Sequence, residues 1–280
     1  MLLKIGVCQL QVEVDKEMNL AKAEVQVREA AAAGATVICL PEMFNCPYRQ
    51  DWFPRYAELV PQGETTRRLA ALAVETQCYL VGGSFPEMVG DRIYNTALVF
   101  DPCGTIVAKH RKVHLFDVAI PDKIVFQESA VFSPGNTRTV FPLANLPCGL
   151  AICYDLRFPE LFRLMADDQA QIIFVPAAFN MTSGPAHWEL LFRARAVDNQ
   201  VFMVGISPAR NPDATYQSYG HSIIVNPWGE ILWQADAAEN TTVTELNLSE
   251  IRQVRDGLPL LKQRRLDLYR IQDLQGGPVN

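Results

Sequence analysis

The stretch LAICYDLRFPEL, residues 150–161, changes at Cys153 from an apolar strand pattern to a polar helix pattern. On its two sides, LPCGLAIC (146–153) predicts a buried strand and RFPELFRLMADD (157–168) predicts the helix that follows. A residue at such a turn lies at the carboxyl edge of a sheet, where open α/β sheets bind ligands. Cys153 is therefore either a presented nucleophile or one more buried thiol, and its own neighbourhood favours the buried thiol.

The same alternation of strand and helix patterns continues along most of the chain. Short apolar runs bounded by turn residues predict strands, and longer segments ending at glycine or polar residues predict helices. This rhythm is typical of a largely parallel sheet covered by helices. Strands are predicted at 3–10, 36–42, 78–85, 146–153, 171–179 and 201–207, and helices at 19–34, 65–77, 157–168 and 184–200.

Two X-Pro-X-Gly turns, DPCG (101–104) and NPWG (226–229), each separate two strand patterns and predict hairpins. The runs VICLP and IIFVP are also alike, so the chain reads as two similar halves, unless common turn chemistry alone explains the likeness. We expect one α/β domain over residues 1–280, a four-layer αββα sandwich of two packed sheets. The tail, about 258–280, is expected to pack on the body or on a second subunit.

Composition excludes several classes of function. The formal net charge is −6 and no basic stripe is visible, so no nucleic-acid partner is expected. No apolar run is long enough to cross a membrane, and the N-terminal run reads as a core strand rather than a signal peptide. The seven cysteines are irregularly spaced without a C-x-x-C pair. This pattern indicates reduced thiols and a cytosolic protein.

Glu42, Lys112 and Cys153 each follow an apolar strand pattern. Together they would form a nucleophilic site: a carboxylate can take the thiol proton, and an ammonium can bind an oxyanion and lower the thiol pKa. The backbone N–H of Tyr154 would assist at the helix entrance. Each residue also has a plainer interpretation, because Glu42 could cap its loop, Lys112 could be solvated and Cys153 could be core.

The long stretch 113–138 contains Pro, Asp and Gly but has weak periodicity. It predicts a loop without regular structure, and a loop of that length inside a compact domain is usually functional.

Six segments together carry a family resemblance. LPEMFNCPY, KHRKVHLFD, FQESAVFSPG, GLAICYDLRFPEL, GPAHWELLFRARAVDNQ and GHSIIVNPWGE occur in this order and resemble the nitrilase, or carbon–nitrogen hydrolase, superfamily. The resemblance implies a Glu–Lys–Cys triad of Glu42, Lys112 and Cys153, with Glu128 as a second glutamate that orients Lys112. It also implies the αββα fold and a homodimer or higher homo-oligomer, and no metal or organic cofactor.

Within the superfamily, NCPY, HLFD, FQES and FNMTSGPAHWELL resemble the omega-amidase branch. That resemblance implies hydrolysis of the distal amide of α-ketoglutaramate or α-ketosuccinamate through a cysteine thioester. The carboxylate of such a substrate needs a cationic or N–H-rich clamp. The candidates are Arg49, Lys123 and Arg157, unless they pair with surface carboxylates, while Tyr48 and Phe179 could shape the pocket.

Three alternatives stay open. The enzyme could be a deaminated glutathione amidase or another short-chain amidase or nitrilase. It could also be a catalytically idle relative that only binds a partner, although the intact Glu, Lys, Cys and second Glu argue against this. A metal or Cys-His site would use His110, His114, His187 and His221, but HRKVH lacks the glutamate of H-E-x-x-H. His187 and Trp188 are expected to pack their helix.

Overall fold

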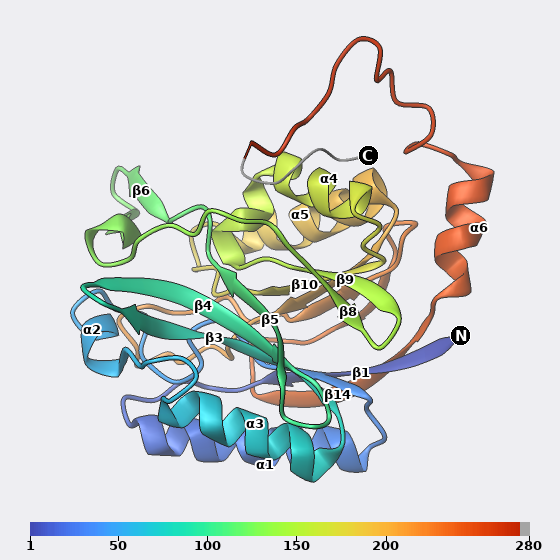
Figure 1. The fold of residues 1–280 in the computed structure, drawn as a ribbon. Helices are drawn as coiled ribbons and strands as arrows, with labels where there is room; N and C mark the ends of the chain where they lie inside the picture. Colours follow the sequence, from blue (N-terminus) through green and yellow to red (C-terminus); the bar gives the residue numbers. More distant parts are fainter. Residues whose placement is uncertain (275–280) are drawn as a thin grey trace.

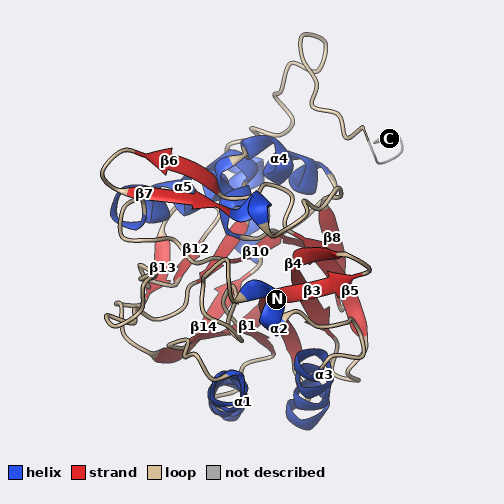
Figure 2. Cartoon of the chain, turned by 90° about the vertical axis from the view of Figure 1, so that its left-hand side faces the viewer, coloured by secondary structure: helices blue, strands red, loops and turns tan. Residues whose placement is uncertain are grey.

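The computed structural model describes residues 1–274 and contains two six-stranded sheets that pack face to face between outer helices (Figure 1, Figure 2). Helices α1 (Lys16–Ala32) and α3 (Glu64–Thr76) cover the outer face of one sheet. Helices α4 (Pro159–Asp167) and α5 (Gly184–Asn199) cover the other. The expected αββα sandwich is thus confirmed.

The first sheet has the order β14-β1-β2-β3-β4-β5. Strands β1, β2 and β3 are parallel, and the hairpin strands β4 and β5 continue the sheet antiparallel. Its strands are β1 (Leu2–Gln9), β2 (Val37–Cys39), β3 (Tyr79–Val89), β4 (Arg92–Phe100), β5 (Ile106–Arg111) and β14 (Asn240–Asn247).

The second sheet repeats this plan in the order β13-β12-β11-β10-β9-β8. Strands β9, β10 and β11 are parallel, and β12 and β13 form the antiparallel hairpin. The likeness of the two halves is therefore a property of the fold. Its strands are β8 (Thr139–Leu143), β9 (Leu146–Leu150), β10 (Ile172–Pro176), β11 (Phe202–Ile206), β12 (Ile223–Val225) and β13 (Ile231–Gln234).

Apolar residues from both sheets fill the space between them. Val37 of β2, Phe174 of β10 and Val204 of β11 belong to one fully buried cluster. All five residues of β10 are buried, which is typical of a parallel strand covered on both faces. Burying so much apolar surface at about 25 cal/mol per Å² is the main force that holds the sheets together.

Local capping explains where the helices begin. The side chain of Asp15 accepts a 3.1 Å hydrogen bond from the Met18 N–H, so α1 begins at Lys16, earlier than the apolar pattern predicts. Helix α4 begins at Pro159, because proline suits the first helical position. Arg157, predicted in this helix, instead ends the 3₁₀ turn η2 (Cys153–Arg157).

The prediction that 113–138 lacks regular structure is wrong in part. This stretch contains β6 (Asp117–Ile120), β7 (Ile124–Gln127) and the 3₁₀ turn η1 (Glu128–Ala130). The two strands pair only with each other, and their periodicity is hidden because each has four residues. The sequence analysis also missed β8, β14, α2 (Phe53–Tyr56) and α6 (Ser249–Gly257).

After α6 the chain runs over the outer face of α4, where the Arg264 guanidinium binds Asp167 at 2.6 Å (Figure 1). The part of the tail from residue 275 to 280 lies outside the described residues. Within residues 1–274, no helix has the length and apolar character that a membrane crossing requires.

Candidate active site

Glu42 lies three residues beyond β2, at the carboxyl edge of the first sheet, and is fully buried. Its Oε1 accepts hydrogen bonds from Lys112 Nζ at 3.0 Å and from Asn95 Nδ2 at 2.9 Å. Its Oε2 accepts a 2.7 Å hydrogen bond from the backbone N–H of Ala178, which follows β10 in the second sheet. The carboxylate therefore lies where the edges of the two sheets meet.

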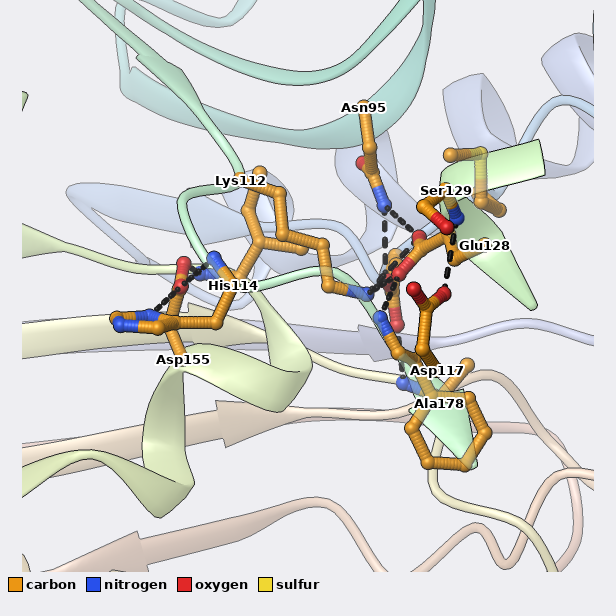
Figure 3. Close-up of polar contacts among 12 residues, drawn as sticks. Asn95, Lys112, His114, Asp117, Glu128, Ser129, Asp155 and Ala178 are labelled. Carbon is orange, nitrogen blue, oxygen red and sulfur yellow. Dashed lines mark hydrogen bonds and ion pairs between the residues drawn. The ribbon is translucent and has the colours of Figure 1, made fainter. Parts of the chain in front are cut away.

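Lys112 is the first residue after β5, and its ammonium lies between two carboxylates (Figure 3). Its Nζ is 3.0 Å from Glu42 Oε1 and 2.8 Å from Glu128 Oε2. Glu128 comes from η1, beyond the β6–β7 hairpin, and its Oε2 also accepts a 2.6 Å hydrogen bond from the Phe116 N–H. Lys112 and both glutamates are buried, which brings three of the expected residues into one cluster.

Cys153 opens η2 three residues beyond the end of β9 and is 5 % exposed. Its φ is +46°, in the left-handed region that costs a non-glycine residue about 1–2 kcal/mol. The thiol contacts Glu42, so the fourth expected residue joins the same cluster. The strand-to-helix turn predicted from the sequence is confirmed, with a 3₁₀ turn placed between strand and helix.

The charges in this cluster settle which groups hold protons at rest. Burial raises the pKa of the Cys153 thiol well above its usual value, Glu42 raises it further, and Lys112 offsets only part of this. Burial alone would lower the pKa of Lys112, but the carboxylates of Glu128 and Glu42 outweigh it and raise that pKa. Burial also raises the pKa of Glu128, against the opposing effect of Lys112. The resting site therefore holds a neutral thiol beside a charged ammonium.

A small cleft leads from Cys153 to the surface. Its inner end is lined by Cys153, Tyr154, Arg157, Phe179 and other residues, and its outer part has a volume of about 210 Å³. The inner part has a volume of only about 10 Å³, and it shares five lining residues with the outer part, so the two parts adjoin. These residues are Phe116, Tyr154, Arg157, Asn180 and Ser183.

Arg157 is the cation of this cleft. Its guanidinium lies 4.8 Å from the ring centre of Phe179 and 5.6 Å from that of Tyr154. Its Nη1 is 3.0 Å from Nδ1 of His187, which is exposed rather than packed in its helix as expected. Over residues 1–274 no carboxylate forms an ion pair with Arg157, which leaves its charge available in the cleft.

The other two clamp candidates lie elsewhere. Arg49 binds Asp51, with Nη2 and Oδ2 at 2.8 Å, and lines a cavity of about 360 Å³ that Glu42 and Tyr48 also line. Lys123 is exposed at the turn between β6 and β7. Tyr48 is buried, with its hydroxyl 3.5 Å from Lys112 Nζ and 3.4 Å from Glu128 Oε1. The fold thus groups Tyr154, Arg157 and Phe179 beside Cys153, and Tyr48 beside Lys112.

Sequence reasoning missed several residues of the site. Asn95, in β4, bridges Glu42 and Glu128 through one amide nitrogen, at 2.9 and 3.3 Å. Tyr216 stacks on Tyr48 and donates a 2.5 Å hydrogen bond to the Ala178 carbonyl. The only signal for Asn95 was a polar residue inside an otherwise apolar strand pattern. Tyr216 lies in an irregular segment and gave none.

The histidine pair of HRKVH does not form an open ligand set. His110 Nε2 and His114 Nδ1 both bind Asp155, at 3.1 and 2.8 Å. Across the described part of the chain, no group of three or more His, Cys, Asp or Glu side chains is placed to hold a metal ion.

Comparison with known proteins identifies the family to which this chain belongs. Residues 4–256 match the carbon–nitrogen hydrolase family, and the chain belongs to that family. It is 47 % identical to the omega-amidase NIT2 of Mus musculus over 269 residues, covering 96 % of this chain and 97 % of that protein. Nit3 of Saccharomyces cerevisiae, a member of branch 10 of the nitrilase superfamily, is 40 % identical with a TM-score of 0.88. That superposition covers 94 % of this chain and 97 % of Nit3.

A solved structure of lower identity has a modified active-site cysteine. A mutant of the amidase from Nesterenkonia sp. AN1 is 25 % identical with a TM-score of 0.77, covering 95 % of this chain and 98 % of that one. That structure shows the result of Michael addition of acrylamide at the active-site cysteine of the amidase. The family and the layered fold expected from the sequence motifs are therefore confirmed.

Proposed function

We propose that the protein is an omega-amidase, which hydrolyses the distal amide of an α-keto dicarboxylic acid monoamide to the keto acid and ammonia. The observation that carries the proposal is the short cleft that joins the Cys153 thiol to the Arg157 guanidinium. A small substrate with an amide at one end and a carboxylate at the other fits this pair of groups. The identity of 47 % to a mouse omega-amidase supports the same substrate class.

In the proposed reaction, Cys153 is the nucleophile and Glu42 is the general base. The neutral thiol gives its proton to Glu42 as Sγ attacks the amide carbon. The ammonium of Lys112 and the backbone N–H of Tyr154 bind the oxyanion of the tetrahedral intermediate. Glu42 then returns the proton to the leaving nitrogen, so the C–N bond breaks and leaves ammonia and a thioester.

Water completes the cycle. Glu42, again unprotonated, takes a proton from water as the water oxygen attacks the thioester carbon. The C–S bond then breaks, Glu42 returns that proton to the Cys153 sulfur, and the acid is released. Glu128 holds Lys112 through the 2.8 Å contact, and Asn95 fixes the position of one carboxylate relative to the other with a shared donor. No step needs a metal or an organic cofactor.

Arg157 is the proposed carboxylate clamp, with Phe179 and Tyr154 as the walls that orient it. Arg49 is a weaker candidate because Asp51 already neutralises its charge. Val118 and Ile124 of the β6–β7 hairpin line the outer part of the cleft. Lys123 is therefore a candidate only if this hairpin moves toward the cleft.

Ammonia release from α-ketoglutaramate and succinamate tests the proposal. Wild-type turnover that Cys153→Ala abolishes and Cys103→Ala retains would support it, since Cys103 is an exposed thiol outside the site. Turnover of deaminated glutathione or nitriles, without turnover of these amides, would show that the proposed substrate class is wrong. The absence of turnover on all of them would favour the idle relative.

We further propose that the protein is a homodimer or higher homo-oligomer in the cytosol. Helix α5 exposes Leu190 (63 %), and the neighbouring turn exposes Trp228 (57 %), which are apolar groups that a second copy could cover. All seven cysteines are free thiols, as a reducing compartment would keep them. Light scattering of wild type and Leu190→Glu tests the assembly, and a monomeric wild type at micromolar concentration contradicts it.

A further inference from the structure

Asp155 is a buried carboxylate that the proposed reaction does not use. It lies two residues after Cys153 in η2 and is fully buried. A carboxylate removed from water is costly unless it is paired and hydrogen-bonded. Burial alone would raise the pKa of Asp155, but hydrogen bonds from His110 and His114 outweigh it and hold that pKa well below its usual range. Asp155 therefore stays ionised and accepts every hydrogen bond it makes.

Those hydrogen bonds connect the turn of Cys153 to the segment of Lys112. Oδ2 accepts from the Ile152 N–H at 3.0 Å and contacts His110 Nε2 at 3.1 Å. Oδ1 accepts from the His114 N–H and contacts His114 Nδ1, both at 2.8 Å. His110 and His114 are the residues two before and two after Lys112. One carboxylate on the cysteine turn thus binds the lysine segment on both sides.

The same bonds hold a strained turn in place. Cys153 has φ +46°, which persists only where surrounding contacts enforce it. The bond from the Ile152 N–H to Asp155 closes the turn directly around Cys153. His114 is held in turn by stacking on Phe158, with ring centres 3.6 Å apart. Figure 3 shows Asp155 and His114 on one side of Lys112, whose side chain extends away from them toward Glu128.

We propose that Asp155 is a positioning residue, which sets the place of Lys112 Nζ relative to Cys153 Sγ by binding Ile152, His110 and His114 together. The inference rests on the proposed roles of Lys112 and Cys153, but not on the identity of the substrate. An oxyanion site tolerates little displacement, because a shift of about 1 Å in a reacting group can cost about 100-fold in rate. Loss of the Asp155 hydrogen bonds would therefore both displace Lys112 and relax the turn at Cys153.

The test measures the reactivity of Cys153 without any substrate. In a Cys103→Ala background, the rate of alkylation of Cys153 by iodoacetamide is followed against pH by peptide mass spectrometry. Asp155→Asn keeps the size of the side chain, but its amide N–H group must face a backbone N–H donor, either that of Ile152 or that of His114. Lys112 lowers the pKa of Cys153, so its displacement should slow alkylation at pH 8 by about 10-fold or more and move the profile to higher pH.

The matched control is Asp101→Asn. Asp101 also accepts two backbone hydrogen bonds in a turn, from Cys103 at 2.9 Å and Thr105 at 2.8 Å, but at the opposite end of β5. It should lower the melting temperature and leave the alkylation profile unchanged. If Asp155→Asn does the same, lowering only the melting temperature, Asp155 is structural and the proposal is overturned.

A second pair of variants decides the matter if Asp155→Asn does not fold. His114→Phe keeps the stacking on Phe158 and removes the Nδ1 donor, whereas His114→Asn can place an amide donor near the Nδ1 position. The proposal expects slow alkylation and a fall in kcat larger than any change in KM for the Phe variant, with partial rescue by Asn. A wild-type alkylation profile in His114→Phe overturns it. Because alkylation needs no amide, an error in the substrate class would leave this result intact.

Discussion

The backbone N–H of Ala178 donates a 2.7 Å hydrogen bond to Oε2 of Glu42, although the two residues are 136 positions apart. Glu42 follows β2 in the first sheet and Ala178 follows β10 in the second, so the bond joins the equivalent edges of the two halves. With Oε1 bound by Lys112 and Asn95, the carboxylate is oriented by both halves of the chain. The proposed base is therefore fixed by the packing of the sheets.

Glu42→Gln should remove the base and keep the fold. The glutamine oxygen can still accept from Lys112 and Asn95, although its amide nitrogen then faces the Ala178 N–H, and it cannot take the thiol proton. We expect kcat to fall by about 10²–10⁴-fold with a small change in KM. The control is Glu87→Gln, a buried carboxylate bound by Arg111 and Thr96 outside the cluster, which should lower stability and spare kcat. Near-normal turnover in Glu42→Gln would exclude Glu42 as the base.

Arg157→Met should discriminate between charged and uncharged substrates. Loss of a charge-assisted contact of about 1.5–3 kcal/mol should raise KM for α-ketoglutaramate by about 10- to 100-fold. An uncharged short amide should lose far less, because it has no carboxylate to bind. Arg49→Met is the matched control, since Arg49 is paired with Asp51. Equal losses on both substrates would show that Arg157 supports the cleft wall instead.

Acid unfolding should report the ionised Asp155. Its folded-state pKa lies below the unfolded value of about 3.9. The stability it contributes is therefore present above that pH and is lost as the pH falls. Asp155→Asn has no carboxylate to protonate, so its free energy of unfolding should fall less steeply between pH 5 and pH 3.5, by up to about 1 kcal/mol per pH unit. Urea midpoints measured across this range give both slopes, and parallel slopes would contradict the ionised state.

Gly135→Ala should disturb the segment of Lys112 through packing alone. A Cβ at Gly135 would collide with the carbonyl of Arg111, and the Gly135 N–H donates a 2.8 Å hydrogen bond to the Lys112 carbonyl. We expect about 1–3 kcal/mol of destabilisation and a lower kcat. Gly257→Ala in α6 meets no atom within 4 Å and should stabilise by about 0.5–1 kcal/mol. Thermal and urea unfolding of both variants measure the difference, and equal stability would show that Arg111 can move aside.

Regular elements with strong periodicity were predictable, and weak or short ones were not. The parallel strands of both sheets and the helices α1, α3, α4 and α5 were recovered to within a few residues, because buried parallel strands have continuous apolar runs. Strand β14 was missed because it is rich in Thr, Asn and Glu and lies at a sheet edge beside β1. The hairpin of β6 and β7 was missed because strands of four residues show too little alternation to register.

The residue types of the proposed reaction can be read from strand patterns and motifs: a carboxylate, an ammonium and a thiol after apolar strands, within segments that resemble the family. Local chemistry suffices there, because apolar periodicity and turn residues act over a few positions. Only the tertiary structure decides which of several plausible side chains meet. It brings Asn95, Ala178 and Asp155 to the site and places Arg157, rather than Arg49, beside Cys153. These contacts depend on how two sheets pack, and that packing sums small apolar contributions from the whole chain.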